Sequence, residues 1–185
     1  TGHFLLFATK LGLIKKTKLE EYVKINKNGK FALRFKLEGD SLVNVRSGTE
    51  DVDIVMISST GLASRFSCTN INATGRVSAG KYGIKTGSRK GADGGHVVGM
   101  IATGNVSTQI LTISRNGMAK RSRFGTGERI PHLDAEGVQK MNKDGELMFE
   151  TDGYRKTRPG AKGAYTMNLD AEAGDEIISA RHIPD

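Results

Sequence analysis

Positively charged side chains recur shortly after a glycine that is repeated four times along this sequence. The glycines are Gly12, Gly61, Gly117 and Gly153, and the cations stand two to four residues beyond each of them. These cations are Lys15, Lys16, Arg65, Lys120, Arg121, Arg155 and Lys156. Cations at a fixed repeat position neutralise successive phosphates of a polyanion and release its counterions, which gives affinity without base readout. The pattern predicts a row of cations along one rim of a repeat array.

A second set of cations lies in glycine-rich stretches between the repeated glycines. Glycine lets a phosphate backbone approach closely and exposes peptide N–H donors. This set comprises Arg76, Lys81, Lys85, Arg158 and Lys162. We expect both sets to contact DNA phosphates. Base readout is not expected, because no recognition helix is visible in the sequence.

Residue types that perform catalysis or hold metals are scattered. The four histidines show no metal-ligand spacing, and Cys68 is the only cysteine. Residues 125–127, Gly-Thr-Gly, lack the third glycine and the Lys-Ser/Thr of a phosphate-binding loop. We therefore expect no metal, no cofactor and no catalytic residue in this chain.

The overall charge favours a polyanionic partner. The 185 residues carry 28 Lys and Arg against 20 Asp and Glu, a net charge of +8 with a sequence pI near 9.6. Nucleic acid is the first candidate for such a surface. The longest apolar runs have the length of a strand and are too short to cross a bilayer. One cysteine excludes a disulfide framework and is typical of the reducing cytoplasm. We expect a cytoplasmic protein without a membrane partner.

An internal repeat predicts the elements that position the cations. Four segments align without gaps on the repeated glycines: FLLFATKLGLIKKT at 4–17, DIVMISSTGLASRF at 53–66, QILTISRNGMAKRS at 109–122 and GELMFETDGYRKTR at 145–158. Apolar residues alternate with period two on both sides of each glycine. This is the pattern of a β-hairpin whose turn requires a positive φ.

Two further elements follow each hairpin. Crossing segments match at residues 28–33 and 79–84 and, more loosely, at 160–164, and returning strands match at 39–45, 94–100 and 174–180. The hairpin glycines are separated by 49, 56 and 36 residues, so the last unit is irregular. Residues 145–149 either close a shortened third unit or open a fourth one.

The repeat predicts an all-β, propeller-like fold of three or four four-stranded blades, in a closed, open or incomplete ring. The approximate units are 1–52, 53–108, 109–144 and 145–185, within a single repeat domain. A lone unit cannot bury enough apolar surface, so each must pack on its neighbours. A β-sandwich is the alternative, and it requires three sets of matched elements to be accidental.

This pattern resembles the repeats of the β-pinwheel domain at the C-terminus of bacterial DNA gyrase and topoisomerase IV A subunits. Residues 110–121, ILTISRNGMAKR, carry the hairpin part of the resemblance, and residues 4–17 with 28–45 carry the whole unit. It covers the chain except for about residues 123–145. It implies a non-catalytic β-pinwheel that wraps or bends double-stranded DNA. The implied protein partner is the catalytic core of an ATP-dependent type II topoisomerase, which comprises the ATPase subunit together with the rest of the A subunit.

Gyrases of that family carry a heptapeptide, Gln-Arg-Arg-Gly-Gly-Lys-Gly, normally in the first blade. The most similar stretch is residues 157–163, TRPGAKG, which matches at Arg158, Gly160, Lys162 and Gly163. It departs from the heptapeptide at three positions and lies in the last unit. The resemblance therefore does not separate gyrase from topoisomerase IV.

A protein-interaction propeller that binds an acidic partner is the alternative function, because propellers host many unrelated functions. Binding of RNA or of single strands is less favoured. Aromatic residues make up 6% of the chain and do not recur beside the basic positions, whereas base stacking requires them. The sequence leaves the role of residues 123–145 open.

Overall fold

The computed structural model describes residues 2–24, 26–86, 94–170 and 172–183. Almost all of its regular structure is β, apart from two short 3-10 helices, η1 (Leu19–Tyr22) and η2 (Cys68–Asn70). The predicted all-β fold class is confirmed. No helix in the described ranges is long and apolar enough to span a membrane.

Three hairpins form where the repeat predicts them. They pair β1 (Phe4–Thr9) with β2 (Leu13–Lys18), β4 (Asp53–Ser58) with β5 (Leu62–Ser67), and β8 (Gln109–Ser114) with β9 (Ala119–Arg123). The turn residues Gly12, Gly61 and Gly117 have φ values of 94°, 86° and 86°. Residues with a Cβ rarely adopt such φ values, which explains the glycine at each turn.

The predicted returning strands complete the repeated unit. They are β3 (Leu42–Gly48), β7 (Val97–Thr103) and β13 (Ile177–Ile183), and each pairs antiparallel with the first strand of its own hairpin. Three sheets of the same design therefore stand in sequence along the described chain. Residues of the predicted units 109–144 and 145–185 share the third sheet.

A unit donates one short strand to the sheet of the unit before it, which we call strand exchange. The short β6 (Lys81–Tyr82) follows the second hairpin but pairs with β2 of the first. In the same way, β12 (Ala164–Tyr165) follows the third hairpin but pairs with β5 of the second. These two crossing segments thus each supply the fourth strand of the preceding sheet, giving the orders β3-β1-β2-β6 and β12-β5-β4-β7. The third sheet has the order β13-β8-β9 among the described residues.

The core lies between the sheets in two clusters, and β4 contributes side chains to both of them. Ile54 and Met56 belong to a cluster shared with the first sheet, whereas Val55 and Ile57 belong to a cluster shared with the third. All four side chains are fully buried. Because successive residues of a strand point to opposite faces, an uninterrupted apolar run is what a central sheet covered on both sides requires.

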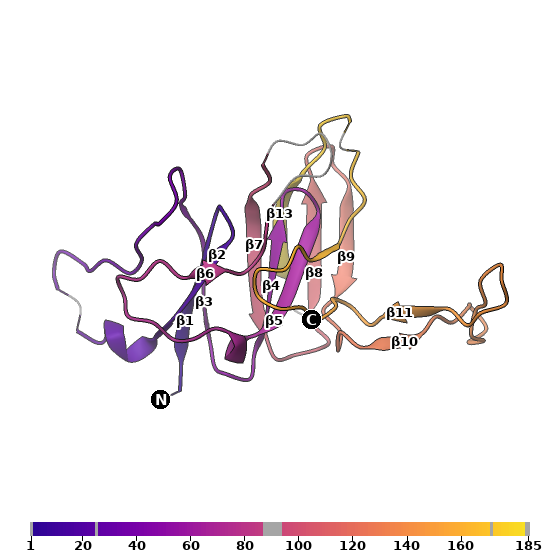
Figure 1. Cartoon of the computed structure of the whole chain (residues 1–185), viewed down its shortest axis with the longest axis horizontal. Coiled ribbons are helices and arrows are strands. Elements are labelled where there is room, and N and C mark those ends of the chain that lie inside the picture. The colour runs from indigo at the N-terminus through magenta and orange to yellow at the C-terminus, as the bar shows by residue number, and fades with distance from the viewer. Residues whose placement is uncertain (1, 25, 87–93, 171, 184–185) are drawn as a thin grey trace.

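The hairpin predicted around Gly153 is wrong. Residues 149–151 form β11 (Phe149–Thr151), which pairs with β10 (Arg129–Pro131) instead of folding back across the glycine. Tyr154 N donates to Phe124 O at 3.0 Å, so the chain after Gly153 is held by the end of β9. β10 and β11 form the base of an arm, residues 129–151, that projects away from the sheets (Figure 1).

An eight-residue repeat builds this arm and explains why its glycine resembled a hairpin glycine. The repeats are HLDAEGVQ at 132–139, KMNKDGEL at 140–147 and MFETDGYR at 148–155. In the first two, one side-chain oxygen, on Asp134 or Asn142, accepts from the N–H groups two and four residues later. These are turns closed by a short polar side chain, and they need a glycine at a fixed position.

Candidate nucleic-acid interface

Lys15, the first cation of the predicted rim, lies inside the protein. Its side chain is 2% exposed, and Nζ donates hydrogen bonds to the carbonyl oxygens of Ala32, at 2.5 Å, and of Arg76. Burial lowers the pKa of Lys15 from 10.5 to about 8, with a further contribution from the charge of Arg76 and partial opposition from Glu21. Lys15 therefore joins β2 to two crossing segments.

Lys16 is enclosed on the other face of β2. Its side chain is 3% exposed, and Nζ donates to both carboxylate oxygens of Glu50, at 2.8 and 2.9 Å, and to Cys68 O at 3.0 Å. The ammonium group also lies 4.6 Å from the centre of the Phe4 ring. These contacts satisfy all three donors of the ammonium group within the protein.

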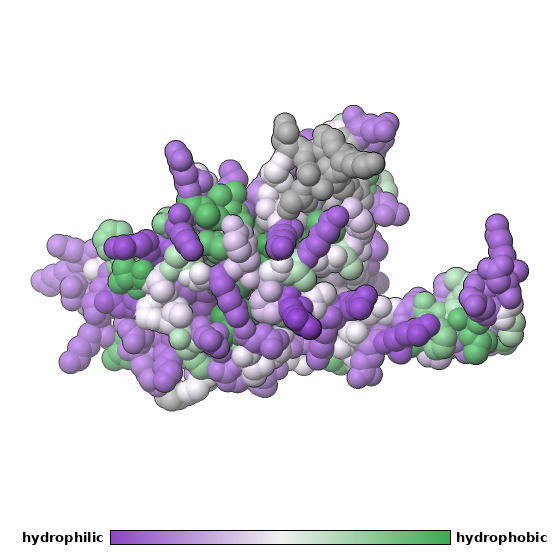
Figure 2. Space-filling view, viewed as in Figure 1, coloured by the Kyte–Doolittle hydropathy of each residue, from purple (hydrophilic) through white to green (hydrophobic). Residues whose placement is uncertain are grey.

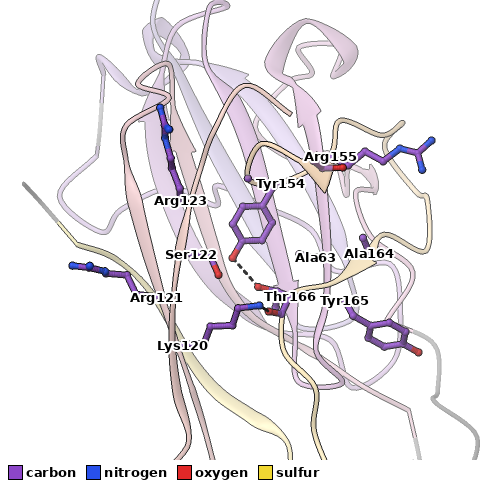
Figure 3. A pocket seen from close by; sticks show the side chains of 12 residues that line it. Ala63, Lys120, Arg121, Ser122, Arg123, Tyr154, Arg155, Ala164, Tyr165 and Thr166 are labelled. Atoms are coloured by element: carbon purple, nitrogen blue, oxygen red, sulfur yellow. Dashed lines mark hydrogen bonds between the residues drawn. The ribbon is translucent and has the colours of Figure 1, made fainter. Parts of the chain in front are cut away.

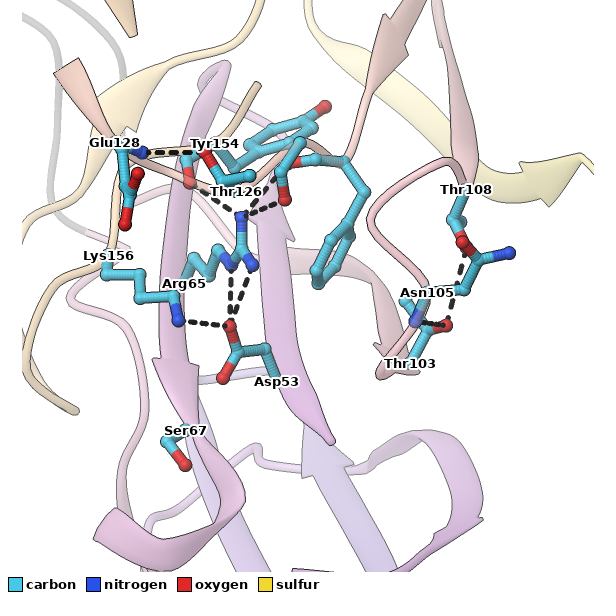
Figure 4. A network of polar contacts seen from close by, with 12 residues as sticks. Asp53, Arg65, Ser67, Thr103, Asn105, Thr108, Thr126, Glu128, Tyr154 and Lys156 are labelled. Carbon is cyan, nitrogen blue, oxygen red and sulfur yellow. Dashed lines mark hydrogen bonds and ion pairs between the residues drawn. The ribbon is translucent and has the colours of Figure 1, made fainter. Parts of the chain in front are cut away.

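Arg65 connects the second unit to the third (Figure 4). Its guanidinium group donates to Asp53 Oδ2 at 2.7 and 3.0 Å and to the carbonyl oxygens of Phe124, Gly125 and Tyr154 at 2.9 to 3.1 Å. It also stacks over the Phe124 ring at 4.1 Å. The side chain is 2% exposed. Its hydrogen bonds and ring contact hold the two units together, and we call this arrangement the Arg65 latch.

The predicted rim is therefore not available to DNA at Lys15, Lys16 and Arg65. The physical reason is the exchanged strand, because the crossing segment of the following unit covers β2 and β5. Thr74 N donates to Lys16 O at 2.8 Å, and Thr157 N donates to Arg65 O at 2.6 Å.

The corresponding residues of the third hairpin are exposed and border a groove of about 570 Å³ beside β9. Figure 3 shows Arg121 and Arg123 on one side of this groove and Arg155 on the other. Lys120 Nζ donates to Thr166 O at 2.7 Å, and Arg123 lies 3.8 Å from the Asp152 carboxylate. Sequence reasoning missed Arg123, although it shares the alternation of Arg121 in the run Lys-Arg-Ser-Arg.

The glycine-rich crossing segments bring a second group of cations together, which we call the crossing-segment cluster: Lys81, Lys85, Arg158 and Lys162. Ile84 forms a parallel bridge with Ala161, and Lys85 N donates to Ala161 O at 3.2 Å. The two segments that carry the cluster therefore run side by side. All four side chains are exposed, although Lys81 Nζ also donates to Asn70 O at 2.6 Å.

The remaining predicted cations differ in their exposure and in their partners. Arg76 is half-buried, and its guanidinium group donates to Phe31 O at 3.0 Å. Lys156 is 57% exposed and lies 3.2 Å from the carboxylate of Asp53. Arg155 is exposed at the groove beside β9.

The heptapeptide-like stretch, residues 157–163, contacts β5 at both of its ends and the crossing segment of the second unit in its middle. Gly160 N donates to Gly83 O at 2.9 Å, and Gly163 has a φ of 83°. A Cβ at Gly163 would overlap the Ala63 carbonyl oxygen, so this glycine allows close packing on the host strand. Arg158 and Lys162 are thereby carried on a backbone fixed from both sides.

No group of three or more His, Cys, Asp or Glu side chains in the described ranges could hold a metal ion. The exposed cations of the crossing-segment cluster and of the groove beside β9, by contrast, carry groups that can pair with anions. Ammonium and guanidinium groups on a fixed backbone offer donors and charge in positions that a polyphosphate can follow.

Comparison with known proteins places this arrangement in a family. The model of the DNA gyrase C-terminal domain, a beta-propeller, matches residues 3–47, 53–103 and 108–125. The chain belongs to this family. The match ends at residue 125, before the arm begins.

Similar curated proteins are DNA gyrase A subunits. The chain is 37% identical over 137 residues to the DNA gyrase A subunit of Staphylococcus epidermidis, covering 74% of this chain and 15% of that protein. It is 32% identical over 176 residues to the DNA gyrase A subunit of Metamycoplasma arthritidis, covering 95% of this chain and 16% of that protein. The chain thus spans about a sixth of the length of these relatives.

Solved structures show the same fold. The C-terminal domain of DNA topoisomerase IV superposes with a TM-score of 0.61 at 18% identity, covering 99% of this chain and 62% of that one. The DNA gyrase A C-terminal domain superposes with a TM-score of 0.56 at 16% identity, covering 99% and 66%. The predicted β-pinwheel family is confirmed.

Proposed function

We propose that this domain binds duplex DNA without sequence preference and bends it, as a non-catalytic accessory domain of a type II DNA topoisomerase. The observation that carries the proposal is the crossing-segment cluster. Lys85, Arg158 and Lys162 are exposed on adjacent backbone segments, in a chain of net charge +8 that belongs to the gyrase C-terminal domain family.

The charges of the cluster supply what a bent duplex requires. Bending DNA through 40–90° over a site of 20–30 base pairs costs on the order of 1–6 kcal/mol, which phosphate contacts along a continuous track must offset. Each neutralised phosphate also releases counterions, so affinity falls as salt is added. Arg155 and Lys156, which lie just before the heptapeptide-like stretch, extend the proposed track.

The proposed partners follow from the relatives, which are gyrase A subunits several times longer than this chain. The catalytic core of such an enzyme, formed by its ATPase subunit together with the rest of its A subunit, would cut and pass the DNA. This domain would hold the duplex nearby. Its proposed location is the cytoplasm, where that DNA lies.

Binding to random-sequence duplexes, measured by fluorescence anisotropy over a range of salt concentrations, tests the DNA contact. The double variant Arg158→Glu, Lys162→Glu should weaken binding at least about tenfold on every sequence. It should also reduce the slope of log affinity against log salt by about two, since each phosphate contact contributes about 0.9.

The matched control reverses the same amount of charge on the arm, with Lys140→Glu and Lys143→Glu. Both residues are exposed and lie in the eight-residue repeats. This control should change affinity only slightly and equally for all duplexes. Equal losses in the two double variants would show that net charge, and not the crossing-segment cluster, governs binding.

A topological assay tests bending. Relaxed circular DNA is incubated with the domain and a relaxing topoisomerase, and the linking-number distribution is then read on a gel. A DNA-wrapping domain shifts this distribution, whereas a protein adaptor leaves it unchanged. The sign of a shift in linking number also helps to distinguish gyrase-like from topoisomerase IV-like behaviour.

A protein-interaction role is the second candidate, and the arm favours it. Leu133, Val138 and Met141 are 48%, 62% and 62% exposed along this projection, and Figure 2 shows hydrophobic surface among its charged side chains. Exposed apolar groups gathered on one element commonly mark an interaction site. If the arm serves such a role, excising it should abolish binding of that partner and spare DNA binding.

A further inference from the structure

A tyrosine occupies the same position in the two crossing segments that pair with a neighbouring sheet. β6 pairs Tyr82 with Leu13, the residue after the turn glycine of the first hairpin. β12 pairs Tyr165 with Leu62, which holds the same place in the second hairpin. The two tyrosines are also alike in exposure, at 48% and 50%. Sequence reasoning missed this shared position, because the match expected at residues 160–164 stops short of the second tyrosine.

Tyr82 has a neighbouring backbone segment on both sides. On one side β6 pairs with β2. On the other side Gly160 N donates to Gly83 O at 2.9 Å, and a Cβ at Gly160 would lie 3.4 Å from Tyr82 O. About half of the tyrosine still reaches solvent, although both of these neighbours belong to this chain. A ring on a backbone fixed in this way offers apolar contact area at a small cost in conformational entropy.

The cations of the crossing-segment cluster surround this position along the chain. Lys81 precedes Tyr82, and Lys85 follows it by three residues. The other two cations of the cluster each stand two residues from Gly160, the glycine that packs beside Tyr82. Cations can bind phosphates, whereas a tyrosine ring supplies no charge to neutralise one. The ring is therefore suited to a different part of a nucleic acid.

Tyr165 repeats the arrangement in the next unit. Its ring points away from Lys120 and Tyr154, which border the groove beside β9 (Figure 3). Gly163 holds the backbone before it close to β5, since a Cβ there would overlap the carbonyl oxygen of Ala63. A duplex that follows the crossing segments from one unit to the next thus meets a tyrosine in each of the two units.

We propose that Tyr82 and Tyr165 contact the sugars of the bound duplex and give the domain a preference for DNA over RNA. The proposal rests on the proposed DNA-binding function and names two residues that select the nucleic acid. Each ring packs on a deoxyribose between the phosphates that the cations of the cluster hold.

The order of groups in a nucleic-acid strand supports this assignment. A sugar lies between each phosphate and the next, so a ring placed among phosphate-binding cations faces a sugar. Deoxyribose has only hydrogen atoms at C2′, and its carbon atoms can pack against an aromatic ring. A ribose at the same place presents its 2′-hydroxyl, the group by which proteins distinguish RNA from DNA. Covering that hydroxyl with a ring removes its hydration without supplying a hydrogen bond, which is unfavourable.

Affinities for a DNA duplex and an RNA duplex of the same sequence and length, measured by fluorescence anisotropy over a range of salt, test the proposal. Tyr82→Val removes the ring and keeps a residue that favours strands. DNA binding should weaken at least about fivefold and RNA binding less than about twofold, since a ring contact with a nucleotide is lost only on DNA. The slope of log affinity against log salt should not change, because no charge is removed.

Two further variants serve as controls. Tyr82→Phe keeps the ring and should retain both the affinity for DNA and the preference over RNA. Phe149→Val removes an aromatic ring of similar exposure, 41%, from the arm, and it should change neither affinity. Adding Tyr165→Val to Tyr82→Val should multiply the two losses on DNA, because the rings stand in different units and act on different sugars.

Several results would overturn the proposal. Equal losses on DNA and RNA, or a lowered urea midpoint in Tyr82→Val protein that accounts for both losses, would make Tyr82 a structural residue of β6. A loss in Tyr82→Phe as large as in Tyr82→Val would assign the contact to the hydroxyl group and not to the ring.

Failure of this proposal is distinguishable from failure of the proposed function. If both tyrosine variants bind DNA as the wild type does while Arg158→Glu, Lys162→Glu still weakens binding, only the sugar contact is wrong. If the charge-reversed variant binds every duplex as tightly as the wild type, the proposed DNA interface is itself wrong.

Discussion

Lys15 and Arg65 carry their charges where water is largely excluded, and backbone carbonyl oxygens accept their hydrogen bonds. A buried charge is tolerated only when hydrogen bonds or an opposite charge compensate for lost hydration. Lys15 donates to two carbonyl oxygens, whereas Arg65 donates to three and also pairs with the Asp53 carboxylate. The two residues therefore respond differently to pH and to substitution.

Lys15 should make stability rise with pH in the alkaline range. Its pKa is lowered from 10.5 to about 8 in the folded protein, so between these values the unfolded chain binds more protons than the folded one. The penalty for a buried charge is present in full below the folded pKa and is relieved as pH rises toward 10.5. Relative to Lys15→Met, the wild type should gain roughly 1–2 kcal/mol between about pH 7.5 and 9.5.

Urea unfolding of both proteins at several pH values measures this difference, and taking the difference removes titrations common to both. A constant gap between the two proteins over the window would mean that Lys15 keeps an ordinary pKa. If the variant gains stability relative to the wild type as pH rises, folding raises the pKa of Lys15 instead of lowering it.

At the scale of elements, the latch formed by Arg65 should matter far more than the exposed cation beside it. Arg65→Met leaves three carbonyl oxygens without their donor, and it leaves the Asp53 carboxylate with the exposed Lys156 as its partner. This should cost about 3–5 kcal/mol of unfolding free energy, the typical penalty for breaking a buried pair. Lys156→Met removes the other partner of Asp53, but that ammonium group is 57% exposed, so the loss should stay below about 1 kcal/mol.

Chemical unfolding of the two variants compares these costs. Similar losses would show that Arg65 is not a latch. Folded Arg65→Met protein should also keep its affinity for DNA, because the guanidinium group does not reach the surface. A selective loss of DNA binding in this variant would indicate that Arg65 contacts DNA, as the sequence predicts.

Local pattern explains which elements the sequence could predict. The hairpins at Gly12, Gly61 and Gly117 depend on alternation and on a positive φ, both of which are readable within about a dozen residues. The burial of Lys16 depends on residues 73 and 74, which lie nearly 60 positions further along. Strand exchange between units leaves no mark beside the cation itself, so a buried latch and a surface cation look alike in sequence.

The error at Gly153 has a different origin. The eight-residue repeat places Gly137, Gly145 and Gly153 each four residues after an apolar side chain, and the hairpin glycines have the same spacing. This shared spacing imitates the hairpin pattern. The period of eight over residues 132–155 distinguishes this pattern from that of a hairpin. The heptapeptide-like stretch, by contrast, was found from sequence, although only the structure shows that Gly163 packs against β5.

At the scale of the whole molecule, charge and apolar exposure are divided between the sheets and the arm. Residues 129–151 contain three Lys and Arg against five Asp and Glu, a net charge of −2, so the rest of the chain carries +10. The arm contributes no residue to either hydrophobic core cluster. Its removal is therefore expected to change interactions of the domain and not its folding.

Replacing residues 129–151 by a two-residue glycine-containing turn tests this division. Arg129 and Thr151 are paired across the base of the arm, so a short turn can join the flanking residues without straining the sheets. The shortened protein should unfold within about 1 kcal/mol of the wild type, since Phe124 and Tyr154 keep their places in the core. It should bind DNA severalfold more tightly at low salt, because net charge rises from +8 to +10, and this gain should vanish as salt screens it. Circular dichroism, chemical unfolding and anisotropy measure these quantities. Loss of cooperative unfolding would make the arm part of the fold, and weaker DNA binding would make it part of the DNA interface.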